Sequence, residues 1–155
     1  MVRSSAPWRR LVTLGLVLVV LLTACAPKLA QPDRLKKAEQ LYATVLELYA
    51  GGRFAEAIPL AQEAHAIRKN VLGPRHPVTT TSLDILGVLC VETGAYAQAR
   101  SLLEEALATS KAVLGLRHPD TATTLNNLGV LYVKTGAYAQ AQPLLEEALA
   151  TSKAV

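Results

Sequence analysis

The chain has 155 residues, enough for one domain, and a formal net charge of +4. Its first 24 residues hold three of the sixteen basic residues and no acidic one, so 13 basic and 12 acidic residues remain beyond them, a net charge of +1. A nearly neutral body of this kind offers no electrostatic footprint for nucleic acid, and we exclude that class of partner.

Residues 1–24 have the order of a secretory signal peptide. A basic start is followed by an uncharged apolar run at 11–22, which is shorter than the roughly 20 residues that a membrane-spanning helix needs. The run ends in Leu22-Thr23-Ala24-Cys25, which resembles the bacterial lipobox. The resemblance implies that the Cys25 thiol receives a diacylglycerol and becomes the new N-terminus. An uncleaved anchor, or an ordinary signal peptide with a chance cysteine, is the alternative.

The segment after the signal predicts how the protein is held in the envelope. Residues 25–34 contain two prolines and read as a tether, with Asp33 as the cap of the helix that follows. Ala26 and Pro27 stand where the resembled lipoproteins of two-membrane bacteria carry an aspartate for inner-membrane retention, which favours the outer membrane. Lipidation of Cys25 leaves Cys90 as a single thiol, which we expect to be buried on a helix face.

An internal repeat of 42 residues organises the rest of the chain. Gly52, Gly94 and Gly136 are 42 residues apart, and residues 94–113 return at 136–155 with two changes. Apolar residues at spacings of three and four predict helices at 35–50, 78–92 and 120–134, each followed by a second helix at 54–71, 96–113 and 138–155. No stretch alternates with period two, so the fold class is all-α.

The third repeat resembles the tetratricopeptide pattern, with Leu125-x2-Leu128-Gly129-x2-Tyr132 and then Ala141-x3-Leu145. The period of 42 and the phrase "HPDTATTLNNLGVLY" are similar to the kinesin-light-chain-like branch of that family. The resemblance covers residues 35–155 and implies a right-handed α-solenoid of three repeats, at about 35–71, 78–113 and 120–155. Gly87 and Gly129 are then the places where paired helices approach closely.

The search for catalytic or metal-binding groups gives only structural interpretations. The glutamate pairs at 104–105 and 146–147 are neighbours on one helix and read as a solvated outer face. His76 and His118 recur because the turn recurs, and His65 reads as a lone surface or rim residue. The sequence therefore predicts no enzyme, no catalytic residue, no metal site and no cofactor.

The first helices of the three repeats are expected to line the concave side of the solenoid. Helical spacing places a set of groove residues there, with asparagines that can bind the main chain of a peptide: Tyr42, Leu46, Thr81, Asp84, Val88, Glu92, Thr123, Asn126, Asn127, Val130 and Lys134. Lys134 is surrounded by acidic residues, which argues against specificity for a free C-terminal carboxylate.

These patterns predict a lipid-anchored scaffold of the bacterial envelope that binds a peptide segment of a partner protein in the groove. The alternatives are a structural subunit of an envelope complex, or the sensing front of a longer repeat-containing enzyme. The last repeat has no polar capping unit after it, so Leu144, Leu145 and Leu149 should be partly exposed. We expect self-association through this end, or further repeats in the natural protein.

Overall fold

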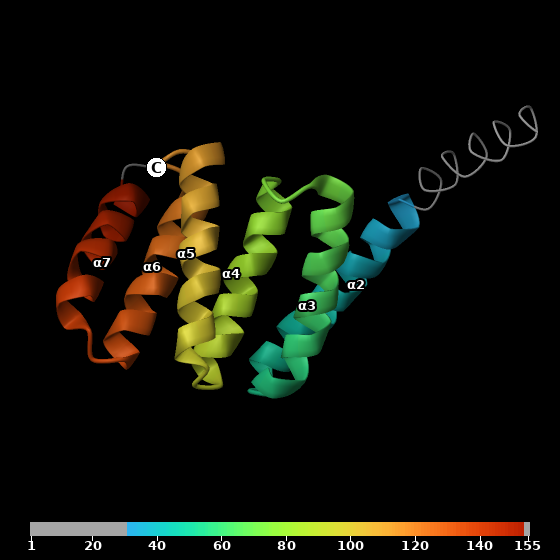
Figure 1. The fold of residues 1–155 in the computed structure, drawn as a ribbon, viewed down its shortest axis with the longest axis horizontal. Helices are drawn as coiled ribbons and strands as arrows, with labels where there is room; N and C mark the ends of the chain where they lie inside the picture. The colour runs from blue at the N-terminus through green and yellow to red at the C-terminus, as the bar shows by residue number, and fades with distance from the viewer. Residues whose placement is uncertain (1–30, 154–155) are drawn as a thin grey trace, which may run out of the picture. The chain divides into compact units, whose positions relative to one another are not determined.

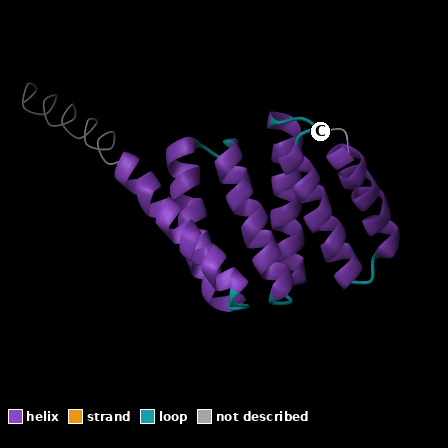
Figure 2. Cartoon of the chain, turned by 180° about the vertical axis from the view of Figure 1, so that it is seen from behind, coloured by secondary structure: helices purple, strands orange, loops and turns teal. Residues whose placement is uncertain are grey.

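A computed structural model describes residues 31–153, and all regular structure in this range is helical. Six helices follow one another, side by side and in chain order (Figures 1 and 2): α2 (Gln31–Ala50), α3 (Phe54–Leu72), α4 (Pro77–Glu92), α5 (Tyr96–Val113), α6 (Pro119–Lys134) and α7 (Tyr138–Lys153). The all-α prediction of three helix-turn-helix repeats is confirmed. One detail was wrong: α2 already includes Gln31, so Asp33 lies in its first turn rather than at a cap.

Glycines end the first helix of each repeat, as the sequence predicted. Gly52, Gly94 and Gly136 have φ of 70°, 79° and 77°, the left-handed conformation that residues with a Cβ rarely adopt. The next backbone N–H then turns back onto the helix, and that of Ala95 donates to the carbonyl oxygen of Cys90 at 2.8 Å. The chain thus reverses within three residues, which brings the second helix alongside the first.

The turns between repeats combine a proline with a histidine. Pro77 and Pro119 occupy the first turns of α4 and α6, where a missing N–H costs nothing. The preceding histidines are the caps: His76 Nδ1 accepts from the Val78 N–H at 3.2 Å, and His118 Nδ1 accepts from the Asp120 N–H at 3.1 Å. These two histidines therefore recur because they begin helices.

Within a repeat, a glycine of the first helix lies under a leucine of the second. A Cβ added to Gly87 would lie 2.6 Å from Leu103 Cγ, and one added to Gly129 would lie 2.6 Å from Leu145 Cδ2. Both distances are too short for carbon atoms, so a side chain at either position would force the opposing leucine to move. The close helix approach predicted at these two positions is confirmed.

Each joint between repeats combines buried leucines with a hydrogen bond of a buried hydroxyl group. At the first joint Ser82 Oγ lies 2.9 Å from His65 Nδ1, and at the second Thr124 Oγ1 donates to Asp84 Oδ2 at 2.6 Å. Burial lowers the pKa of His65. His65 was expected to be a lone surface or rim residue; it is half-buried and not alone, because its ring contacts Ser82 of the next repeat.

The buried core continues across the second joint. Cys90, Leu103, Leu128 and Leu131 share one cluster that joins α4, α5 and α6, and the Cys90 thiol is 1% exposed. The expectation of a buried thiol is confirmed, and burial raises its pKa. Among the described residues, no helix has both the length and the apolar character needed to cross a membrane.

Candidate functional site

The candidate site is a hollow on the side of the stack formed by the first helices of the repeats. Its volume is about 200 Å³. Three helices contribute its lining, namely Tyr49 from α2, then Val88, Val91 and Glu92 from α4, and finally Asn127 and Val130 from α6. All three repeats therefore meet at one apolar depression.

The walls of this hollow combine three valines and a tyrosine with two polar residues, and they are partly open to solvent. Tyr49 is 40% exposed and Val130 is 37% exposed, while Leu46 lies one turn before Tyr49 and is 45% exposed. The Tyr49 ring rests edge-on against Phe54, with ring centroids 5.3 Å apart, which limits the orientations that Tyr49 can adopt. An apolar side chain of a ligand could therefore lose water here without displacing a protein side chain.

The rim of the hollow carries one compensated pair of charges. Lys134 Nζ donates to both carboxylate oxygens of Glu92 at 3.0 Å, which links α6 to α4. This pair is partly exposed, so its contribution to stability is small, but it neutralises the charge of Lys134. A ligand carboxylate would have to compete with Glu92 for Lys134.

Asp84 lies in the joint rather than on the groove surface. It is 8% exposed, and its two oxygens accept from Thr124 Oγ1 at 2.6 Å and from Asn127 Nδ2 at 3.4 Å. Burial raises the pKa of Asp84 to about 6, and the two hydrogen bonds offset only part of that effect. Asp84 thus connects the second repeat to the third.

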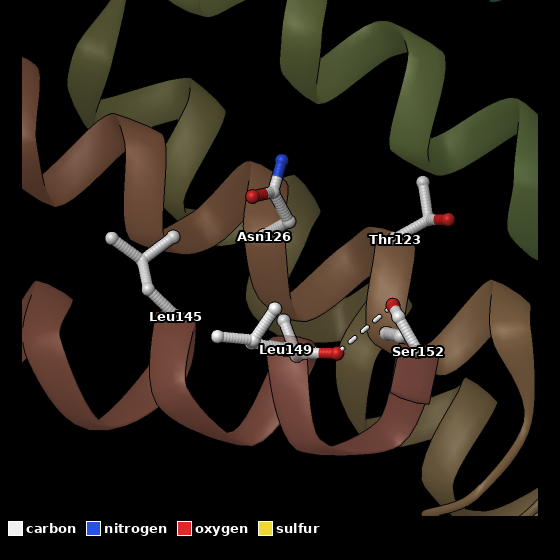
Figure 3. Close-up of a pocket in the computed structure, with 7 residues that line it drawn as sticks. Thr123, Asn126, Leu145, Leu149 and Ser152 are labelled. Carbon is white, nitrogen blue, oxygen red and sulfur yellow. Dashed lines mark hydrogen bonds between the residues drawn. The ribbon is translucent and has the colours of Figure 1, made fainter. Parts of the chain in front are cut away.

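The two asparagines expected to act together lie on different surfaces. Asn127 lines the hollow described above, whereas Asn126 lines a second hollow between α6 and α7, shown in Figure 3. Thr123 lines this second hollow as well, and its hydroxyl donates to the Pro119 carbonyl oxygen at 3.1 Å. Consecutive residues on a helix diverge by about 100°, which is why the pair separates.

Two other predicted groove residues are engaged within their own repeats. The Arg68 guanidinium stacks over the Tyr42 ring, 4.4 Å from its centroid, and burial raises the pKa of the half-buried Tyr42. The Thr81 hydroxyl is exposed and donates to the Pro77 carbonyl oxygen at 3.1 Å. The predicted set therefore divides among the hollow, the joint and the surface.

Tyr49 and Val91 line the hollow but were not among the predicted groove residues. Both follow a predicted groove residue by three positions, Leu46 and Val88 respectively, and residues three apart lie on the same side of a helix. Extending the groove stripe by one step along each helix would have found them.

The glutamates of the second helices make contacts of their own. Glu104 accepts from the Tyr132 hydroxyl at 3.3 Å, and Glu147 lies 3.4 Å from Lys111 Nζ. The interpretation of a purely solvated face was therefore incomplete. Within residues 31–153, no group of three His, Cys, Asp or Glu side chains is arranged to hold a metal ion.

Comparison with known proteins agrees with this architecture. The sequence profile of the tetratricopeptide repeat matches residues 48–112 and 86–154. These matches cover more than half of the chain, which belongs to the tetratricopeptide repeat family. Repeats of this family generally mediate contacts between proteins. No curated protein matches the chain.

Proposed function

We propose that this tetratricopeptide protein is held on a bacterial envelope by a lipid on Cys25 and binds a segment of a partner protein in the hollow formed by α2, α4 and α6. The observation that carries this proposal is the convergence of Tyr49, Val88 and Val130, one from each repeat, on a single apolar depression. Because its lining comes from three repeats, the hollow forms only when these repeats are stacked. Ligand-binding sites commonly lie where several such elements meet.

The chemistry of the hollow suggests a ligand segment with one apolar anchor. Val88, Val91 and Val130 offer an aliphatic wall, and the Glu92–Lys134 pair leaves the rim without net charge. Asn127 uses one amide N–H for Asp84, and its carbonyl oxygen forms no hydrogen bond with the described residues. That oxygen can accept from a main-chain N–H of the ligand.

Site-specific photocrosslinking in membranes tests the binding site. A photoreactive residue in place of Val88 should crosslink a partner, and Val130→Lys in the same chain should abolish the product because it puts a charge into the hollow. Val133→Lys is the matched control, since Val133 is 42% exposed on the same helix but does not line the hollow. Loss of the crosslink with both lysine variants, or with neither, would refute the site.

The anchor is tested separately, because Cys25 and the signal segment lie outside the described residues. Trp8 is the single tryptophan, so cleavage before Cys25 should remove all indole fluorescence from the mature protein. Cys25→Ala should keep Trp8 and accumulate as the unprocessed precursor. Mature membrane-bound protein that still contains Trp8 would contradict the lipid anchor and leave the binding site untouched.

A further inference from the structure

The end face of the third repeat holds a hollow that the site described above does not use. Its volume is about 450 Å³ and no charged side chain lines it. Figure 3 shows Leu145 and Leu149 on α7 and Thr123 and Asn126 on α6; Ala122, Ala148 and Ser152 complete the lining. Leu149 is 55% exposed, which is a large apolar exposure for an ordered helix.

The second repeat shows what this kind of face accommodates. Three of its counterparts, 42 residues earlier, are buried: Leu103 is 0% exposed, Ser110 2% and Asp84 8%. Leu103 shares a cluster with Leu128 and Leu131 of α6, and Asp84 accepts from Thr124 of the same helix. One helix thus covers much of the end face of the second repeat, where Leu107, the counterpart of Leu149, is half-buried and Thr81, the counterpart of Thr123, stays exposed.

The covering helix follows the same pattern at both joints. α6 brings Thr124, then Leu128 and Leu131, and α4 brings Ser82, then Leu86 and Leu89. All six side chains are buried. A hydroxyl residue followed by leucines four and seven positions later is therefore the pattern that fits an end face in this protein.

We propose that the end face of the third repeat binds an amphipathic helix of another protein. This helix bears a serine or threonine, with one leucine four positions after it and another leucine seven positions after it. The two leucines would pack on Leu145 and Leu149, as Leu128 and Leu131 pack on the second repeat. Asn126 takes the place of Asp84, and its amide oxygen would accept from the hydroxyl. The uncharged lining favours the apolar face of a helix over a charged peptide.

A second copy stacked in the same direction does not supply this pattern. It would present α2, which has Gln40, Thr44 and Glu47 at the three positions. These side chains are exposed in this structure and would place a charge and two polar groups against Leu145 and Leu149. The chemistry of the face therefore favours a different helix over head-to-tail stacking of identical chains.

The sequence of α6 itself provides the probe. A fluorescent peptide of residues 119–134, with blocked ends, is titrated against the full chain in mild detergent, and binding is followed by anisotropy. We expect saturable one-to-one binding with a Kd on the order of micromolar. The same peptide with Leu128→Lys and Leu131→Lys should not bind, since it loses the apolar contacts.

Variants of the full chain locate the site. Leu149→Lys should weaken binding roughly tenfold or more, whereas Gln140→Lys, a change at an exposed residue on the opposite side of the same helix, should leave it unchanged. Asn126→Asp should bind more weakly at pH 7.5, because the bound helix would bury a carboxylate as α6 buries Asp84, and Asn126→Leu should also bind more weakly, because it removes the acceptor. Val130→Lys should have no effect, which separates this face from the proposed peptide site.

Three results would overturn the proposal. The first is absence of saturable binding by the α6 peptide, and the second is equal weakening by Leu149→Lys and Gln140→Lys. The third is self-association of the full chain that Leu149→Lys abolishes and the peptide does not compete with. That third result would assign the face to a second copy.

Discussion

The second and third repeats have nearly the same end face, yet α6 covers one of these faces and the other is open. Leu103 and Ser110 are buried, while their counterparts Leu145 and Ser152 are partly or fully exposed. Local sequence is almost identical in the two places, so the neighbouring helix determines the exposure. In a stacked protein of this kind, burial is a property of joints rather than of repeats.

The largest expected difference between the two faces concerns their leucines. Leu103→Ala should cost about 2–5 kcal/mol because it opens a cavity beneath α6. Leu145→Ala, the same chemical change on the open face, should cost about 1–2 kcal/mol, since Leu145 is only partly removed from water. Urea unfolding followed by circular dichroism measures both values. Equal costs would show that the open face is covered in solution.

Asp84 is the ionisable residue of the covered end face, and burial raises its pKa to about 6. An acid with a raised pKa in the folded state stabilises the fold below its unfolded pKa of about 4, and this contribution is lost as the pH rises through 6. Asp84→Asn should therefore stabilise the protein at pH 7.5, by up to about 3 kcal/mol, and flatten the pH dependence between 4 and 6.

The matched change on the open face is Asn126→Asp. Asn126 is exposed, so a carboxylate there stays hydrated, and thermal melts from pH 4 to pH 8 should show almost no change relative to the natural chain. Destabilisation by Asn126→Asp as large as the stabilisation by Asp84→Asn would mean that position 126 is buried in solution.

Alanine substitutions at Gly87 and Gly129 should differ less in their effects on stability. Gly87→Ala should destabilise by about 1–3 kcal/mol, because its methyl group meets Leu103, which α6 holds in place. In Gly129→Ala the opposing Leu145 can shift toward the open hollow, and the gain in helix propensity of up to about 1 kcal/mol offsets the strain. Differential scanning calorimetry should therefore find a clearly lower Tm for Gly87→Ala alone.

The smallest expected effect is at the ion pair of Lys111 with Glu147. The two side chains are 34% and 40% exposed, so a double-mutant cycle should give a coupling of about 0.2–1 kcal/mol, lower at high salt. A coupling above this range would place the pair in a drier environment than the structure shows.

The fold could be read from the sequence because the 42-residue period repeats its own boundary signals. Glycine at the end of α4 and α6, and proline at the start of each, fixed those helices to within a residue. The close approaches at Gly87 and Gly129 were also predictable, since both lie opposite an alanine and a leucine of the paired helix. These features depend on contacts within one repeat.

The candidate site was only partly predictable because it depends on how one repeat rotates over the next. Helical spacing placed Asp84 and Asn126 at equivalent positions of one groove, but the structure buries the first in a joint and leaves the second on the open end. The helical spacing within one helix does not show how the helices of the neighbouring repeat pack against it. The hydrogen bond of His65 with Ser82 was missed for the same reason.

The buried thiol of Cys90 makes the second joint observable without any added label. Cys90 belongs to the cluster that connects α4 and α5 to α6, and the residue is 1% exposed. A soluble alkylating reagent can reach it only while α6 is displaced or the repeats are unfolded, so the rate of modification reports how often that joint opens. The modification rate of Cys90 thus measures how often the second and third repeats separate.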